Sequence, residues 1–290
     1  MLRGILTCCI VLLLATLGNA QSTDILRIEY TSLPDGDGNN RLDRYKVLFN
    51  APINVGADRY LILGSEYNMI DIQRNQGLPF DDSELNKLHV VDVNVGYIFK
   101  INPRWRFIGI ITPRLASNFT NGIEGGDFLV NATATLWKER KDIEKPFRLV
   151  LGLTYNSTTG LPVPLPLINY YKRFHLKWSY VLGIPKSNLR FHLSEKHSFI
   201  SALFLDGYFV NVQNDILLPD DTIGSSLSLS AVVGALGYQY NISRVISFYG
   251  WGGYTMRGSS ILRDDKRKKV FVISDNPGLY FKAGFKISIF

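Results

Sequence analysis

The chain has 290 residues, of which 32 are basic and 25 are acidic, so its formal net charge is +7. The basic residues are spread along the chain rather than clustered, which does not favour nucleic-acid binding. Both cysteines, Cys8 and Cys9, lie near the amino terminus, so residues 21–290 cannot form a disulfide, a thiol nucleophile or a cysteine metal site.

Residues 1–20 have the pattern of a secretory signal peptide. Arg3 gives a short positive region, and residues 5–17 form an apolar core that is too short to cross a membrane comfortably as a helix. Small residues precede the expected cleavage point after Ala20. We therefore expect export through the inner membrane. A buried helix or a membrane anchor is the alternative for this segment.

The rest of the chain alternates apolar and polar residues with a period of two, which is typical of β-strands that have one apolar and one polar face. Residues 89–100 show the pattern most clearly, with Val91 and Val93 opposite Asp92 and Asn94. The predicted strands are 25–31, 44–51, 59–70, 89–100, 104–115, 127–137, 147–156, 164–173, 174–183, 187–194, 199–211, 225–240, 244–258 and 277–290. Alternation is weaker in the middle of the chain, which leaves twelve strands as an alternative to fourteen.

The connections between these strands alternate between long and short. The long ones are 33–41, 71–86, 117–126, 157–163, 212–224 and 259–276. Outer-membrane barrels have short periplasmic turns and long external loops, so this alternation favours such a barrel with both termini in the periplasm. Two links fit less well, because 138–145 is long for a turn and 185–186 is short for a loop. We predict one domain, residues 21–290: an all-β, closed antiparallel up-and-down transmembrane β-barrel of about fourteen strands.

The last stretch, residues 277–290, has an apolar row that ends at Ile289, and its final residue is Phe290. A final amphipathic strand that ends in Phe resembles the closing strand of bacterial outer-membrane β-barrels, which the barrel assembly machinery reads. In that family the apolar row usually includes the terminal Phe, whereas here Phe290 is one step out of phase.

With the signal peptide and the amphipathic strands, residues 21–290 resemble the uncharacterised, porin-like outer-membrane β-barrel families of Gram-negative envelopes. The resemblance implies the fold, a location in the cell outer membrane, contact with its lipid, and recognition of the strand that ends at Phe290 by the assembly machinery. It implies no activity. The charged segment 264–269 in the last long loop is expected to be a solvated tip or a contact for lipopolysaccharide.

One pair of residues fits a catalytic pattern. The sequence His192-Leu193-Ser194 resembles outer-membrane phospholipases and lipid A deacylases, in which a histidine base and a serine nucleophile share one face of a strand. No acidic or amide residue that would orient His192 is evident beside it, although Asn188 lies four residues earlier, and a structural role is the alternative. The histidines show no metal-ligand spacing and no Gly-rich motif opens a helix, so we predict no metal, no cofactor and no enzyme activity.

If the apolar rows face lipid, the opposite rows line the lumen, where basic residues are in excess. The predicted lumen-lining residues are Arg44, Lys46, Glu66, Asp92, Arg106, Arg114, Arg148, Lys177, Lys282 and Lys286, with Asp206 as a less secure member. A charged lining sets which ions a pore prefers, so the sequence predicts a passive, porin-like channel for small solutes with weak anion preference. Two alternatives stay open: a structural or surface-interaction barrel whose lumen is blocked by paired charges, and a lipid-modifying hydrolase.

Overall fold

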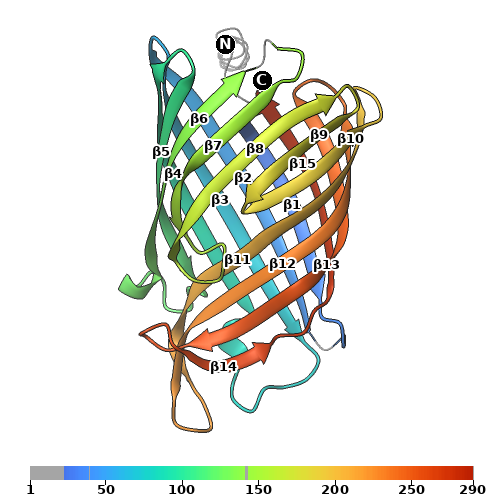
Figure 1. Cartoon of the computed structure of the whole chain (residues 1–290). Helices are drawn as coiled ribbons and strands as arrows, with labels where there is room; N and C mark the ends of the chain where they lie inside the picture. Colours follow the sequence, from blue (N-terminus) through green and yellow to red (C-terminus); the bar gives the residue numbers. More distant parts are fainter. Residues whose placement is uncertain (1–22, 39, 141–142, 290) are drawn as a thin grey trace, which may run out of the picture.

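The computed structural model describes residues 23–38, 40–140 and 143–289, which form a closed antiparallel β-barrel (Figure 1). The predicted signal peptide, residues 1–20, and the terminal Phe290 lie outside the described residues. The described helices are single 3₁₀ turns, η1 (Ser83–Leu85) and η2 (Gly125–Asp127). No helix in the described ranges is long and apolar enough to cross a membrane.

Fourteen of the described strands close the barrel, and one more extends it. In chain order the strands are β1 (Thr23–Pro34), β2 (Asn40–Gly56), β3 (Arg59–Arg74), β4 (Lys87–Asn102), β5 (Trp105–Ser117), β6 (Phe128–Arg140), β7 (Phe147–Asn156), β8 (Val163–His175), β9 (Trp178–Ile184), β10 (Lys186–His192), β11 (His197–Leu217), β12 (Ile223–Asn241), β13 (Ile246–Arg263), β14 (Lys269–Ser274) and β15 (Leu279–Ile289). Each strand from β1 to β13 pairs with the next, β13 pairs with β15, and β15 pairs with β1 to close the ring. The predicted fold and the number of fourteen strands are confirmed.

The extra strand, β14, pairs with the end of β13 and stands beside the ring. It falls inside the stretch 259–276, where the sequence predicted only a loop. This part of the prediction is wrong because Val270, Phe271 and Ile273 are partly buried against an apolar core, which stabilises an extended hairpin beyond the wall. The barrel therefore has a turn end, where β1 begins and β15 finishes, and a loop end, where the β13–β14 hairpin lies (Figure 1).

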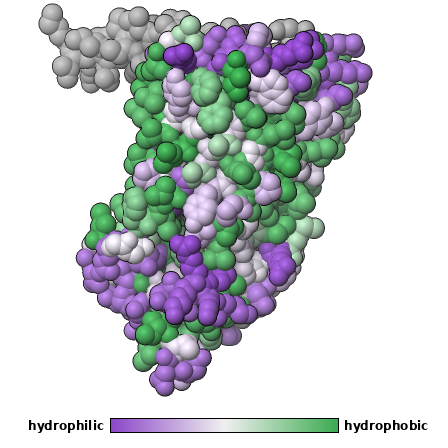
Figure 2. Space-filling model, turned by 60° about the vertical axis from the view of Figure 1, so that its left-hand side comes forward, coloured by the Kyte–Doolittle hydropathy of each residue, from purple (hydrophilic) through white to green (hydrophobic). Residues whose placement is uncertain are grey.

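The barrel wall has an apolar outer face and a largely polar inner face near its middle. On β4, Val93 and Val95 are 49% and 44% exposed, whereas Asp92, which precedes Val93, is 4% exposed. Figure 2 shows apolar surface over the middle of the wall and hydrophilic surface at both ends. An apolar band around a closed barrel is what a membrane-spanning wall requires, because lipid satisfies no backbone hydrogen bonds.

The wall is not equally tall on all sides. Strands β9 and β10 have seven residues each, and their hairpin ends at Pro185, whereas β11 has 21 residues. Beyond the hairpin, β11 crosses toward β5 and forms one parallel bridge there, Asn211 to Ser117. The loop end consequently tapers, as Figure 1 shows.

Two loops cover the outer face of β11 beyond the hairpin. In the β5–β6 loop, Asp127 accepts hydrogen bonds from Asn211 and Gln213, both at 2.8 Å. The β7–β8 loop lies so close that a Cβ on Gly207 would be 2.5 Å from the carbonyl oxygen of Thr158. The part of β11 beyond the hairpin is therefore covered by loops instead of by a neighbouring strand.

An apolar core fills the loop end of the barrel. Its buried members are Ile70, Ile72, Leu85, Leu88, Val90, Ala116, Tyr208, Val210, Val212, Ile216, Leu218, Leu227, Leu229 and Leu262. The inward row of β4 shows the change, because it passes from Asp92 to Val90 and Leu88 toward the loop end. The sequence prediction treated the inner rows as a lining of the lumen, and this core is the part of the interior that it missed.

A charge placed on the apolar band should weaken the barrel. We expect Ile111→Arg, at the middle of β5 and 57% exposed, to lower the free energy of unfolding by about 2–4 kcal/mol because the guanidinium would face hydrocarbon. Denaturant unfolding in lipid vesicles measures the change. The matched control is Ile123→Arg, which lies in the β5–β6 loop and is 71% exposed. Equal effects of the two substitutions would contradict the assignment of the band.

Candidate functional site: the barrel interior

A buried ion pair spans the interior between strands that are not neighbours in the ring. Arg44 on β2 donates two hydrogen bonds to the carboxylate of Asp206 on β11, each at 2.8 Å, and their side chains are 6% and 14% exposed. Tyr280 on β15 donates to the same carboxylate at 3.1 Å. The guanidinium of Arg44 also lies 4.8 Å from the ring centre of Tyr208. We call these four residues the cross-tie.

The cross-tie extends to β3, because the Tyr208 hydroxyl donates to the side-chain oxygen of Asn68 at 3.0 Å. Three strands of one side and β11 of the other are thereby linked by polar contacts inside the wall. A buried ion pair is stable when its geometry is good and its remaining hydrogen-bonding groups are satisfied, and the cross-tie meets both conditions. It therefore fixes where β11 lies in the lumen.

Two further ion pairs join adjacent strands along the inner wall. Lys46 on β2 lies 2.8 Å from Glu66 on β3. Arg114 on β5 donates two hydrogen bonds of 2.7 Å to Asp92 on β4, and a third of 2.7 Å to Ser157. These carboxylates neutralise cations that the inward rows would otherwise present to the lumen.

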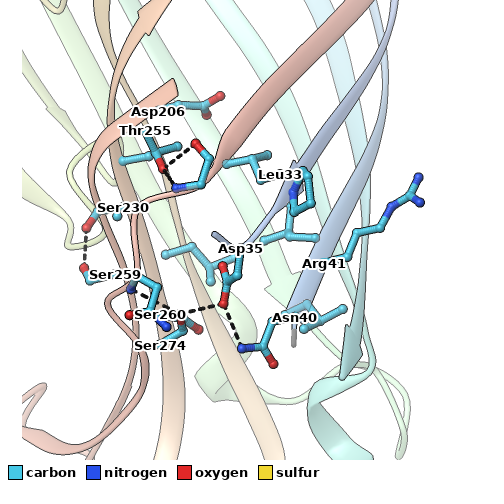
Figure 3. Close-up of a pocket in the computed structure, with 18 of the residues that line it drawn as sticks. Leu33, Asp35, Asn40, Arg41, Asp206, Ser230, Thr255, Ser259, Ser260 and Ser274 are labelled. Carbon is cyan, nitrogen blue, oxygen red and sulfur yellow. Dashed lines mark hydrogen bonds between the residues drawn. The ribbon is translucent and has the colours of Figure 1, made fainter. Parts of the chain in front are cut away.

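Three hollows meet at the cross-tie. A loop-end cavity of about 100 Å³ lies between β1–β3 and β11–β13 (Figure 3). A hydroxyl chamber of about 300 Å³ lies toward β4–β7, and a cationic chamber of about 470 Å³ lies toward β10–β15. Asp206 and Tyr208 line all three hollows. The cross-tie is thus the partition between the loop end and the two chambers.

The cationic chamber holds an excess of basic side chains. Lys186, Arg190, Lys282 and Lys286 line it, and none of the four forms an ion pair among the described residues. The carboxylates in its lining are those of Glu29 and Asp206.

Aromatic rings lie beneath two of these cations. The ammonium of Lys186 lies 4.5 Å from the ring centre of Trp251, and the ammonium of Lys282 lies 5.7 Å from that of Phe204. Such contacts stabilise a cation without neutralising its charge. The chamber therefore keeps a positive potential that attracts anions.

The hydroxyl chamber is different in character, because amide and hydroxyl groups line much of it. Thr112 donates to Asn94 at 2.7 Å, and the hydroxyls of Thr133 and Thr154 lie 2.7 Å apart. These groups offer neutral hydrogen bonds. The charged residues of the lining are all held in ion pairs: Lys46, Glu66, Asp92, Arg114 and Asp206. The two chambers together give the interior one positive side and one neutral polar side.

The comparisons with known proteins place the chain in a family. The family model described as "Domain of unknown function (DUF6268)" matches residues 65–288. The chain belongs to this family. No curated protein matches it.

Several solved barrels are similar to this DUF6268 member. They include "KdgM porin in complex with disordered oligogalacturonate" (10% identity, TM-score 0.38, covering 91% of this chain and 99% of that one) and a NanC porin (11%, 0.40, 91% and 100%). Another is the translocator domain of autotransporter NalP from Neisseria meningitidis (10%, 0.43, 98% and 95%). At such low identity and TM-score the likeness is one of general barrel architecture. It says nothing of what this chain binds.

The structure places seven of the ten predicted lumen residues around the cross-tie and the chambers: Arg44, Lys46, Glu66, Asp92, Arg114, Lys282 and Lys286. Arg106 lies on the inward row of β5 nearer the turn end, eight residues before Arg114. Arg148 on β7 stacks over Trp137 at 5.2 Å. Lys177 lies in the exposed turn between β8 and β9, because β9 begins at Trp178, whereas the predicted strand began at residue 174.

Sequence reasoning missed several residues of the cationic chamber, namely Arg27, Glu29, Lys186 and Arg190. Lys186 and Arg190 share a row on the short strand β10, where the alternation was too brief to fix which face points inward. Arg27 and Glu29 lie on β1, where the same alternation is present and would have identified them. The signal was therefore available on β1 but not on β10.

The His192–Ser194 pair does not form the arrangement that the catalytic hypothesis required. Strand β10 ends at His192, and the Ser194 hydroxyl lies in the following turn, where it accepts hydrogen bonds of 3.2 Å from the backbone N–H groups of Lys196 and His197. Nε2 of His192 lies 2.9 Å from the hydroxyl of Ser179 instead. Ser194 therefore stabilises a turn, and His192 contacts a side chain of the neighbouring strand β9.

The cross-tie gives a test of stability. We expect Asp206→Asn to lower the free energy of unfolding by about 3–5 kcal/mol, because it leaves the Arg44 guanidinium buried without a counter-charge. The double variant Arg44→Met/Asp206→Leu should recover most of that loss. Denaturant unfolding of the single and double variants forms the cycle that measures the coupling.

The control for this cycle is an exposed pair, Lys100 and Asp58, at 3.0 Å with side chains 36% and 55% exposed. Asp58→Asn should change the unfolding free energy by no more than about 1 kcal/mol. A cross-tie variant that behaves like Asp58→Asn would contradict the role of the Arg44–Asp206 pair in fixing β11.

Proposed function

We propose that this protein is an outer-membrane channel for small anionic solutes, closed at its loop end in the conformation described here. The observation that carries the proposal is the cationic chamber, where Lys186, Arg190, Lys282 and Lys286 lack paired carboxylates among the described residues. Clusters of one charge inside a low-dielectric wall concentrate ions of the opposite sign. A barrel that served only as a rigid scaffold would gain nothing from four unpaired cations.

The proposal refines the passive, porin-like channel that the sequence predicted. The apolar core fills the loop end, and the cross-tie separates the loop-end cavity from the chambers. Passage through the barrel then requires β11 to move away from β2, which breaks the pair of Arg44 with Asp206. In this proposal the channel opens when β11, which is covered on its outer side by loops, changes its position.

A barrel with a permanently blocked lumen is the second candidate. It is supported by the size of the apolar core, which draws residues from β3, β4, β5, β11, β12 and β13. In that case the long loops at the loop end would carry the function, by binding a partner at the cell surface. A lipid-modifying hydrolase receives no support from the contacts of His192 and Ser194.

The location in the outer membrane is part of the same proposal. The apolar band suits contact with membrane lipid, and the long loops would then face outward. The exposed basic residues of segment 264–269, Lys266 to Lys269, suit contact with anionic lipopolysaccharide. Assembly would proceed through the closing strand that ends at Phe290.

The charge of the chamber gives a first functional prediction. In planar bilayers with a salt gradient, the refolded barrel should pass brief currents whose reversal potential indicates anion preference. Lys186→Glu together with Lys286→Glu should abolish or reverse that preference, because carboxylates then replace two of the four unpaired cations. Lys100→Glu, at the turn end and outside the chamber, is the control and should leave the reversal potential unchanged. Equal shifts in both variants would argue against the chamber as the selectivity site.

The partition gives a second functional prediction. Arg44→Ala together with Asp206→Ala removes the cross-tie without leaving a buried unpaired charge, so the barrel should stay open for a larger fraction of the recording. The control pair is Lys46→Ala with Glu66→Ala, which removes an ion pair between adjacent strands and leaves the link from β2 to β11 intact. A barrel that carries no current in any variant, while its folding is intact, would favour the blocked-lumen candidate.

A further inference from the structure

The cationic chamber has the size of a ligand site, and its cations are accessible from inside it. Ligand pockets are usually hollows of about 300–1,000 Å³, and this chamber measures about 470 Å³. Lys186 is exposed, and Arg190, Lys282 and Lys286 are partly exposed. Because these side chains line the chamber, a solute within it would meet the four cations directly.

The acids of the chamber already have other partners. Glu29 accepts a hydrogen bond from the hydroxyl of Tyr249, and Asp206 accepts hydrogen bonds from Arg44 and Tyr280. Among the described residues, neither carboxylate forms an ion pair with any of the four cations. The cations of the chamber therefore have no carboxylate of the protein as a direct partner.

Three of the four cations also have free hydrogen-bond donors. Lys186, Lys282 and Lys286 form no hydrogen bond in the part of the chain that the structure describes, although each ammonium carries three N–H groups. Arg190 donates one hydrogen bond, to the side-chain oxygen of Gln239 at 3.1 Å. The chamber consequently offers many donors to a solute that brings its own acceptors.

The positive charge of the chamber is larger than one single-charged anion would balance. Among the described residues, seven bases and two acids line it. Two of the bases, Arg27 and Lys46, pair with Asp24 and Glu66 outside the lining. With these two carboxylates included, seven bases face four acids, an excess of three. Coulomb attraction grows with the charge of the solute, so an anion with two charges should bind more tightly here than an anion with one.

The strands place like charges beside one another, which costs stability. In the β15–β1 pair, Lys286 is directly opposite Arg27, and like charges in this arrangement are destabilising. Lys282 shares one face of β15 with Lys286, as Lys186 shares one face of β10 with Arg190. A bound anion would offset this repulsion, so the folded barrel should gain stability from its ligand.

The four cations form two rows that run toward the turn end. Strands β10 and β15 both finish there, so Arg190 and Lys286 lie nearer the turn end, and Lys186 and Lys282 lie deeper. The ammonium of Lys282 lies 5.6 Å from the ring centre of Tyr280, a member of the cross-tie. A solute that comes from the turn end would thus meet the outer two cations first and the deeper two beside the cross-tie.

The two deeper cations are close enough to hold one small solute between them. Both lie over the ring of Phe204, the ammonium of Lys186 at 5.3 Å from its centre and that of Lys282 at 5.7 Å. The two ammonium groups are therefore at most about 11 Å apart, and because a charge-assisted hydrogen bond spans about 2.8 Å, up to about 5 Å remains between two oxygens that bind one to each. The acidic groups of a short dicarboxylate have a spacing of this order.

We infer that the cationic chamber binds a short organic dianion, with one acidic group on Lys186 and the other on Lys282. Arg190 and Lys286 attract the solute from the turn end. The inference rests on the proposed anion channel and names its class of solute, dianions in preference to single-charged anions. It accounts for an excess of three positive charges around donors that lack acceptors.

The test compares two probes of different charge, succinate and butyrate, on the full barrel refolded in detergent. Titration calorimetry at constant ionic strength should give succinate a dissociation constant about tenfold lower than that of butyrate. Lys186→Gln and Lys282→Gln should each bring the two constants within about threefold of one another, because one acidic group then loses its cation. Lys100→Gln, at the turn end and outside the chamber, is the control and should keep the full ratio.

Two results would overturn the inference. One is an equal affinity of the unaltered barrel for both probes, or no binding of succinate. The other is a succinate preference that persists in both Lys186→Gln and Lys282→Gln. As a second measurement, succinate should raise the denaturant midpoint of the unaltered barrel more than butyrate does at the same concentration, because the ligand binds the folded chamber. Equal midpoints with the two probes would contradict the inference as well.

Neither measurement records current, so the results separate this inference from the channel proposal. A barrel that is anion-selective in bilayers but binds succinate and butyrate equally would support the channel and overturn the dianion site. A barrel that prefers succinate but shows no anion preference in bilayers would support the site and overturn the channel.

Discussion

The interior of this barrel depends on one interaction, the ion pair between Arg44 and Asp206. It holds β11 against β2, across the lumen rather than along the wall, and Tyr208 and Tyr280 complete its hydrogen bonding. Because both charges are buried, neither is stable without the other. The position of β11 follows from this pair, and the division of the lumen into three hollows follows from the position of β11.

Most of the fold could be predicted because its signals are local. A period of two in apolar residues identifies each strand within ten residues or so, and the parity of loop lengths gives the arrangement of neighbours. What the sequence did not reveal is β14 and the loop-end core. On β4 the row that holds Asp92 continues as Val90 and Leu88, and no local pattern tells whether such a row faces water or meets another strand.

The candidate site was predictable only in part, and for a similar reason. An inward-facing charge can be recognised from its row, as Arg114 and Lys282 were. Whether the charge is neutralised depends on contacts between distant strands: Arg44 and Asp206 are separated by 162 residues. The unpaired state of Lys186 and the pairing of Arg44 are therefore properties of the closed ring, and the loop-end cavity between β1–β3 and β11–β13 exists only once the ring is complete.

The short β9–β10 hairpin has a consequence for how this family can diverge. Surface loops usually tolerate changes in length and sequence because the rest of the fold does not pack against them. Here the β5–β6 and β7–β8 loops take the place of a missing strand. The β5–β6 loop supplies Asn118 and Asp127 to groups of β11 that would otherwise lack partners, and the β7–β8 loop packs against Gly207. Insertions in these two loops should be tolerated as poorly as insertions in a strand, whereas the β13–β14 connection, whose residues 265–268 are exposed, should tolerate them better. Differences in loop length between members of the family would then be concentrated at the β13–β14 side of the loop end.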